Sequence, residues 1–282
     1  MSTSVQLPTN SGTWRILVGI PLVLLFGLPL LYGVLSAFKS PLEAASPNQG
    51  FLPRQWSLEN FTSLSSGGVP LASFIGNSIA VTSLTMLFTV VVAVPAGYAF
   101  SRLRFPFRRA FFALTIAVLL VPSQAIVVGI FSVMSFLRLT NRFVGLALVY
   151  SMTQLPFAVY MMRNSFDSIP AEIAEAAEID GCTKLTVLWQ VYLRLVPPGI
   201  VTIALFAFIA AWNEFFMALI LLSNNADFTL PVALVNAQTG VLNTIDWGSL
   251  QAGIATAILP SVILFTLLQR YYVAGLISGA VK

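Results

Sequence analysis

The chain has 282 residues, of which 57% are hydrophobic and only 9% are charged, with 14 Lys and Arg against 10 Asp and Glu. A soluble domain carries roughly 25% charged residues, so this composition excludes a globule whose whole surface faces water. The basic residues are scattered between apolar runs instead of forming a stripe, which argues against a nucleic-acid partner. We therefore expect an integral membrane protein.

The residue inventory also excludes several kinds of chemistry. The chain has no histidine, which removes Ser-His-Asp catalysis, the two-histidine zinc motif and a histidine proton relay. Its one cysteine, Cys182, cannot form an intrachain disulfide. The sequence contains no GxxxxGK[ST] pattern, so it has no P-loop for ATP phosphates. We expect no catalytic residue, no metal site and no cofactor in this chain.

Six charge-poor apolar stretches follow one another along the chain. Each reaches the roughly 20 residues that a helix needs to cross about 30 Å of hydrocarbon. Lipid offers no partners to open sheet edges, so these stretches must be helical. The predicted fold class is an all-α integral membrane protein with six transmembrane helices, in which an N-terminal tail (1–15) precedes a single membrane domain (16–282). The predicted spans are 16–38, 78–100, 110–137, 143–162, 199–222 and 247–269.

Proline falls inside most of these spans, where its missing N–H favours a kink. The kinks are compatible with simple bundle packing and with helices that surround a pathway. The prolines concerned are Pro21, Pro29, Pro95, Pro122, Pro156 and Pro260.

The distribution of Lys and Arg predicts the topology. One side of the membrane receives ten of them, including all four between Arg102 and Arg109, and the other side receives four. The positive-inside rule then places both termini in the cytoplasm. Loops 39–77 and 223–246 become external, and the first of these could meet a partner through Trp56, Phe61 and Phe74.

The cytoplasmic loop 163–198 holds five of the ten acids and has its own helical signals. Pro170 suits the start of a helix, and acids near that end suit the helix dipole. Gly181 can supply the left-handed residue that ends the helix about ten residues later. A second amphipathic piece, Thr183 to Val196, follows and leads into the fifth span.

The short helix has two different faces. Ile173, Ala176, Ala177 and Asp180 lie at helical spacing, and their small side chains permit close approach of another backbone. The acids form a separate strip, Glu172, Glu175 and Glu178. Helix, glycine bend and second helix together would make an angled lever attached to a membrane span. The alternative is an ordinary helix pair lying on the bilayer.

One motif in this loop resembles a known family. Glu175-Ala176-Ala177-x-x-Asp180-Gly181 is similar to the EAA motif of permease subunits of ATP-binding cassette (ABC) importers, above all the maltose-type carbohydrate uptake family. The motif also lies where that family has it, in a cytoplasmic loop before the penultimate span. The resemblance implies that these residues form a coupling helix seated in a cleft of a separate ATPase subunit.

The resemblance extends over nearly the whole chain. It includes the end of the second span (95–102), the entry to the loop (Arg163 and 168–170), the triplet 212–214 and the C-terminal tail 270–282. Two positions depart from the family pattern. Cys182 replaces an alanine, and Leu193-Arg194 replaces a Leu-Pro pair, with proline arriving only at 197–198. The bend into span five is therefore expected to be shifted.

Candidate solute contacts are the polar groups inside the spans. Glu214 is the only acid there, about 22 Å along a helix that begins near Gly199. With Trp212 and Asn213 it offers a stacking ring, an amide and an acceptor that suit a sugar, although a polar lock between subunits is an equally good interpretation. Gln124 and Gln154 are further candidates for lining the pathway.

The resemblance implies the transmembrane subunit of an ATP-driven importer of sugars or sugar-like solutes in the bacterial cytoplasmic membrane. Its partners would be two ATP-binding cassette subunits that bind ATP and Mg, a second homologous permease and an extracytoplasmic solute-binding protein. An ion-coupled secondary transporter is the alternative, but one in-span acid and no clear repeat count against it. An intramembrane enzyme lacks paired acids or bases. The sequence does not name the solute.

Overall fold

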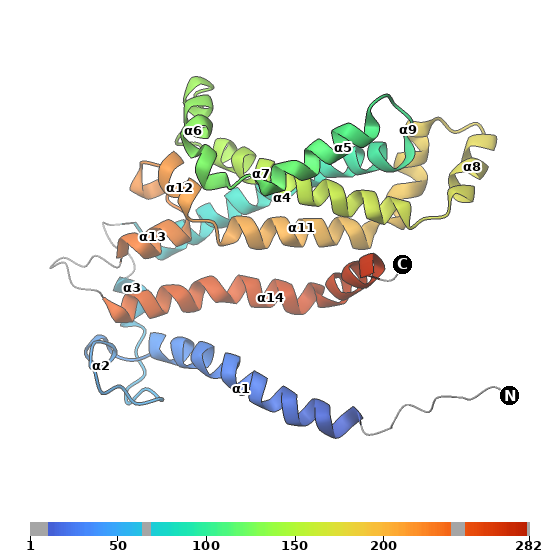
Figure 1. Ribbon diagram of the computed structural model, residues 1–282. Helices are drawn as coiled ribbons and strands as arrows, with labels where there is room; N and C mark the ends of the chain where they lie inside the picture. Colours follow the sequence, from blue (N-terminus) through green and yellow to red (C-terminus); the bar gives the residue numbers. More distant parts are fainter. Residues whose placement is uncertain (1–10, 64–68, 238–245, 281–282) are drawn as a thin grey trace. The chain divides into compact units, whose positions relative to one another are not determined.

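The computed structural model describes residues 11–63, 69–237 and 246–280, and these contain helices and loops without any strand (Figure 1). The predicted N-terminal tail lies mostly outside the described residues, as do the side chains of the C-terminal segment 268–282. The chain divides into two compact units, Met1–Gly68 with Leu234–Ala257 and Val69–Ala233 with Ile258–Lys282.

The helices follow one another with short connections. The α-helices are α1 Ser11–Ala37, α2 Pro41–Ala44, α3 Glu59–Ser63, α4 Leu71–Arg102, α5 Arg108–Ala117, α6 Val127–Phe136, α7 Phe143–Asp167, α8 Ala171–Ile179, α9 Lys184–Val187, α10 Leu193–Leu195, α11 Pro197–Trp212, α12 Phe216–Leu221, α13 Leu230–Ala237 and α14 Trp247–Ala280. Between them lie the 3₁₀ turns η2 Val118–Leu120, η3 Ser123–Ile126 and η5 Asn225–Asp227, and the π-helical turn η4 Leu188–Tyr192.

The membrane spans agree with the predicted number when bent helices are included. Within the described residues, four helices are long and apolar enough to cross a bilayer: Ile16–Ala37, Leu71–Arg102, Phe143–Asp167 and Trp247–Leu267. Two further helix pairs meet the same requirement together. Arg108–Leu120 and Ser123–Phe136 bend by 93°, and Lys184–Leu195 and Pro197–Trp212 bend by 80°, so the total is up to six. The all-α multi-pass fold is confirmed.

Three details of the predicted spans were wrong. The third stretch is not one straight helix, because Pro122 forces the preceding residue, Val121, into an extended conformation (φ −88°, ψ 116°). The fifth stretch stops at Trp212 and resumes only at Phe216. The second begins at Leu71 instead of 78, so that Phe74, predicted on the external loop, is buried inside α4.

The other five prolines predicted within spans lie inside the continuous helices α1, α4, α7 and α14. Pro122 alone among the six stands at a break, where η2 ends and η3 begins. At Pro122 the residues on both sides also leave the α conformation, which the other five prolines do not show.

Helices α4, α7 and α11 pack side by side and form the centre of the second unit (Figure 1). Glycine permits close approach at two of these helix contacts. A methyl group built on Gly97 of α4 would lie 2.5 Å from Cβ of Met162 in α7. One built on Gly199 of α11 would overlap the side chain of Ser165 in α7. Larger residues at these positions would push the helices apart.

In the first unit, hydrogen bonds from a buried lysine hold the loop that follows α1 in place. Lys39 is fully buried, and its Nζ donates hydrogen bonds to Ser36 Oγ (3.2 Å), Gln49 Oε1 (3.3 Å) and the Gly50 carbonyl (2.8 Å). The same nitrogen lies 4.5 Å from the centre of the Tyr32 ring. These contacts satisfy the charge without a carboxylate and hold residues 49 and 50 against the end of α1.

We predict that Gly97→Ala destabilises the membrane bundle by about 1–3 kcal/mol, because the added methyl group overlaps α7. Gly76→Ala is the matched control, since Gly76 lies in the same helix and has no atom within 4 Å of the added methyl group. Thermal unfolding of the purified chain in detergent measures the difference. Equal unfolding temperatures for the two variants would show that the α4–α7 contact is not close-packed at Gly97.

Candidate functional site

The motif predicted to couple the chain to a partner forms the short helix α8. It begins after Pro170, which has an extended conformation, and ends at Ile179. Gly181 has φ +87°, its N–H donates to the Glu178 carbonyl (3.0 Å), and the N–H of Cys182 donates to the Ala177 carbonyl (3.0 Å). This pair of bonds is a Schellman motif, which only a left-handed residue such as glycine closes without strain. The predicted helix end at Gly181 is confirmed.

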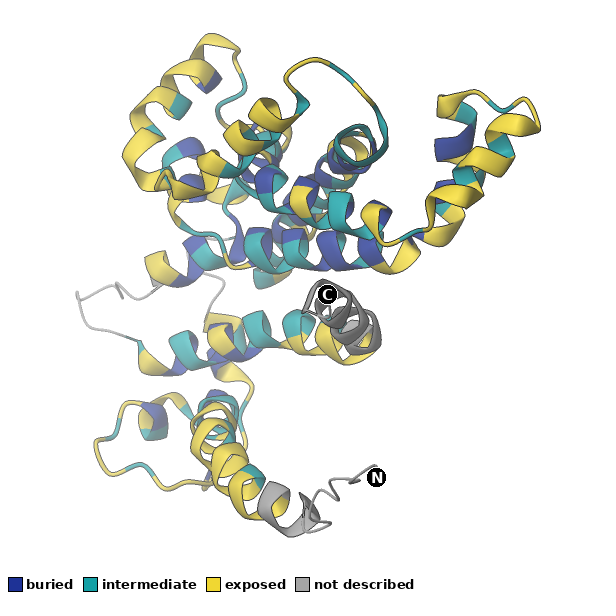
Figure 2. Ribbon diagram, turned by 45° about the vertical axis from the view of Figure 1, so that its right-hand side comes forward, coloured by how far each residue is buried: buried dark blue, intermediate teal, exposed yellow. Residues whose placement is uncertain are grey.

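Most of α8 is exposed (Figure 2). Ala174 and Ala177 are half-buried against the apolar cluster at the ends of α4 and α7. Ile173 and Ala176 are exposed, and Ile179 is 87% exposed. The residues of the predicted face therefore do not share one environment. Ala177 packs toward the bundle, whereas Ile173, Ala176 and Asp180 are exposed. The methyl groups of Ala174 and Ala177 pack against the bundle. The apolar strip of Ile173, Ala176 and Ile179 remains exposed to solvent.

The second arm, residues 184–195, runs from α9 through η4 to α10. Thr183 caps its start, since the N–H of Thr186 donates to Thr183 Oγ1 (3.3 Å). With Arg194 in place of the proline expected from the family pattern, the helix continues to Leu195 before it turns by 80° into α11 at Pro197. We call α8 and this second arm together the lever, residues 171–195.

Three buried aromatic rings join the lever to the membrane helices. Tyr98 of α4, Phe166 of α7 and Tyr192 of η4 have centroids 5.5–5.7 Å apart. The Tyr98 hydroxyl also donates to the Lys184 carbonyl (2.8 Å) at the start of α9. Aromatic pairs in this geometry contribute about 0.5–1.5 kcal/mol each beyond their buried area. The second arm is therefore attached both at its beginning and near its end.

Arg102, at the last turn of α4, reinforces the same junction. Its guanidinium donates to the carbonyl of Phe166, near the end of α7, and to that of Ile169, between α7 and α8. It also lies 5.3 Å from the centre of the Tyr192 ring. Sequence reasoning assigned Arg102 only to topology. Its contacts are distant in sequence, and the one available signal was its place in the family-like segment 95–102.

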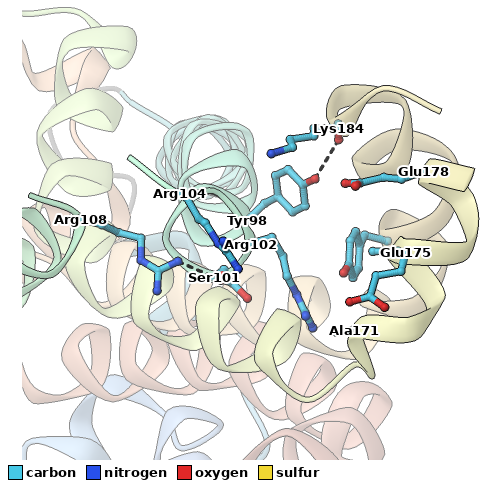
Figure 3. A pocket seen from close by; sticks show the side chains of 11 residues that line it. Tyr98, Ser101, Arg102, Arg104, Arg108, Ala171, Glu175, Glu178 and Lys184 are labelled. Atoms are coloured by element: carbon cyan, nitrogen blue, oxygen red, sulfur yellow. Dashed lines mark hydrogen bonds between the residues drawn. The ribbon is translucent and has the colours of Figure 1, made fainter. Parts of the chain in front are cut away.

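A pocket of about 490 Å³ separates α8 from the end of α4 (Figure 3). Its walls have opposite charge. Arg102, Arg104 and Arg108 lie on the α4 side, and Glu175 and Glu178 lie on α8. In the part of the chain that the structure describes, the one ion pair is between Arg163 and Asp167 (3.4 Å), so these charges face each other without direct contact.

The second candidate site, the triplet 212–214, occupies the break between α11 and α12. The Glu214 carboxylate accepts hydrogen bonds from the N–H groups of Met217 (3.0 and 3.1 Å) and Ala218 (3.3 Å). It therefore caps α12, whereas the sequence placed it along a continuous helix. A carboxylate that accepts these N–H groups stabilises the restarted helix, because they have no partner within it.

The other predicted pathway residues differ in exposure. Trp212 is 2% exposed and stacks on Phe208 with centroids 5.7 Å apart, so its ring is not available to a solute in this structure. Asn213 is exposed and donates to the Ile209 carbonyl (2.7 Å). Gln154 is half-buried one turn from Tyr150, whose hydroxyl contacts the Glu214 carbonyl (3.5 Å).

Gln124 is exposed on η3, away from the triplet in sequence and in element. The described residues include no cluster of three or more Cys, Asp or Glu side chains that could hold a metal ion. Asn213 and Glu214 are thus the predicted polar groups at the α11–α12 break, and Gln154 lies on α7 one turn from Tyr150, which contacts the break.

With both sites described, comparison with known proteins identifies the family. The model of the family "Binding-protein-dependent transport system inner membrane component" matches residues 89–278, which include the whole lever and the triplet. The chain belongs to this family. This transport component is 35% identical over 254 residues to the probable ABC transporter permease protein YurM of Bacillus subtilis, covering 90% of this chain and 83% of YurM.

A second relative supports the assignment, and a solved structure shares the fold. The permease is 32% identical over 262 residues to the diacetylchitobiose uptake system permease protein DasC of Streptomyces coelicolor, covering 92% of this chain and 94% of DasC. A crystal structure of a bacterial ABC transporter involved in the import of the acidic polysaccharide alginate has the same fold. The TM-score is 0.79 at 24% identity, covering 95% of this chain and all of the other.

We predict that Glu214→Ala destabilises the permease by about 1 kcal/mol through loss of the cap on α12, whereas Glu214→Gln retains one acceptor oxygen and most of the stability. Thermal unfolding in detergent measures this difference, and solute affinity in uptake assays is measured alongside. If Glu214→Gln keeps its stability and loses solute affinity, the carboxylate contacts solute as well as α12. Unchanged stability of Glu214→Ala would contradict the capping role.

Proposed function

We propose that this permease is the transmembrane subunit of an ATP-driven importer of sugars or sugar-like solutes in the bacterial cytoplasmic membrane. It forms half of the translocation pathway with a second homologous permease. The observation that carries the proposal is the exposed helix α8, which projects from the bundle and is joined to it through the second arm.

The lever suits the transmission of force from a cytoplasmic ATPase. An ATPase subunit binds the apolar strip of Ile173, Ala176 and Ile179, which is exposed and close to the acids of the motif. Two such ATPase subunits approach each other when they bind ATP and Mg, and they carry the two levers of a permease pair with them. The aromatic junction at Tyr98 and Tyr192 passes this movement to α4 and α11, which alternately opens the pathway to each side.

The sugar specificity of the proposal rests on relatives and on chemistry. DasC, named for diacetylchitobiose uptake, matches this chain over nearly its full length. Asn213 and Gln154 present amide groups, which can donate to and accept from sugar hydroxyls. An extracytoplasmic solute-binding protein delivers the solute at the outer face, where the exposed Trp56, between α2 and α3, is available for contact.

ATP hydrolysis belongs to the ATPase subunits in this proposal, and the permease itself performs no chemistry. The energy source, ATP or an ion gradient, distinguishes this function from that of an ion-coupled carrier. In membrane vesicles that contain the complex and its binding protein, we expect uptake from a panel of labelled disaccharides, including diacetylchitobiose, to stop when ATP is removed. Uptake that survives ATP removal and collapses with an uncoupler would instead support the ion-coupled carrier.

We predict that Gly181→Pro and Ala177→Trp each lower uptake at least about tenfold while the complex still hydrolyses ATP. Proline cannot adopt the φ of +87° found at Gly181, and a tryptophan at 177 would push α8 off its apolar seat. Uptake and ATP hydrolysis are measured on the same reconstituted complexes.

Gly181→Asn is the matched control, because asparagine tolerates the left-handed conformation and should keep coupling. Yield in the membrane and binding of the ATPase subunit show whether each variant has folded. Full transport by both Gly181→Pro and Ala177→Trp would mean that α8 does not transmit the movement.

A further inference from the structure

The turn between α4 and α5 concentrates positive charge and aromatic side chains. Arg104, Phe105, Pro106 and Phe107 lie between Arg102 and the Arg108-Arg109 pair. No Asp or Glu occurs in the sequence from 60 to 166, so the turn has no acid nearby along the chain. We call residues 103–109 the basic turn.

Phe107 is held in a conformation that exposes its ring. It has φ +58°, which is uncommon for a bulky residue, and its side chain is 77% exposed. Folding does not bury this ring, so packing within the chain does not explain why a phenylalanine stands at a position suited to glycine or asparagine. Phe105 differs, because it packs on Phe100 with centroids 5.9 Å apart.

Two arginines of the basic turn have no direct partner among the described residues, and one of them, Arg104, also lines the charged pocket opposite Glu175 and Glu178. Arg108 is occupied, since it donates to the Leu103 carbonyl (2.9 Å) and closes the end of α4. Arg104 and Arg109 are exposed, and within the described residues neither makes a hydrogen bond or an ion pair. Beside the charged pocket, a separate hollow of about 340 Å³ is lined by Arg104, Phe105, Phe107, Arg108 and Arg109, without any acid.

The flanking helices place the basic turn at the surface of the bilayer. Residues Leu71–Arg102 precede it as one membrane-spanning helix, and Arg108–Leu120 follows it as half of a bent pair. Phe111 and Leu114 on α5 are exposed, which suits contact with lipid chains. A turn between two such helices lies at the level of the phospholipid head groups, where arginine meets phosphate and aromatic rings meet the acyl boundary.

We propose that the basic turn binds the phosphate of an anionic phospholipid head group through Arg104 and Arg109, with Phe107 inserted among the acyl chains. Charge complementarity and the exposed ring both favour this occupant. An acidic surface of an ATPase subunit would suit the arginines, but it gives no role to an exposed phenylalanine that lies beside lipid-facing residues.

The test compares phospholipid binding by the purified full-length chain in detergent. Fluorescent phosphatidylglycerol and phosphatidylcholine are titrated against the wild type and against the Arg104→Gln/Arg109→Gln double variant. We expect the wild type to prefer phosphatidylglycerol, and the double variant to lose about fivefold in affinity per arginine, or about 25-fold in total. Inorganic phosphate at matched concentration should not displace the lipid, which separates a head-group site from a free-phosphate site.

The matched control is Arg138→Gln/Arg142→Gln, which removes the same charge from two exposed arginines between α6 and α7. This variant should bind phosphatidylglycerol within about twofold of the wild type, because its arginines lie outside the basic turn. Phe107→Asn, which tolerates positive φ, should weaken binding of both lipids severalfold without loss of folded protein.

Three results would overturn the proposal. The first is equal affinity of the wild type and Arg104→Gln/Arg109→Gln for phosphatidylglycerol. The second is an equal loss in both double variants, which would reflect net charge alone. The third is loss of ATPase binding in Arg104→Gln/Arg109→Gln with unchanged lipid affinity, which would assign the basic turn to the ATPase.

Discussion

The junction of Tyr98, Phe166 and Tyr192 determines whether the lever and the membrane helices can move as one body. The three rings come from α4, α7 and the second arm, and all three are buried. Arg102 adds hydrogen bonds to the backbone at the end of α7. Because buried rings and a charged hydrogen-bond donor have few alternative arrangements at this density, the junction holds the second arm firmly against the bundle, as the proposed coupling requires.

Much of the fold could be predicted from sequence, because lipid leaves the backbone only one solution over 20 apolar residues. The two breaks could not. Pro122 resembles the five prolines that stay inside helices, and its effect depends on η2 and η3 on either side. The break after Trp212 contains no proline, and it is compensated by the Glu214 cap, which is visible only once α12 is known to start at Phe216.

The candidate site shows the same division between local and distant information. Gly181 and the EAA motif are local signals, and the structure forms the predicted helix and its Schellman end there. The inward turn of Ala177, the charged pocket and the aromatic junction depend on contacts between distant segments. Trp212 is instructive in this respect, because a tryptophan in a span suits a sugar, yet Phe208, one helical turn earlier, stacks on its ring.

The paired prolines at 197–198 separate two mechanical elements of the chain. Neither nitrogen can donate a hydrogen bond, so two carbonyls near the end of the second arm receive none from the start of α11. Bending at this point therefore stretches fewer main-chain hydrogen bonds than bending anywhere within α11. The change of direction at the root of the lever therefore leaves the hydrogen-bonded ladders of the second arm and of α11 intact on either side.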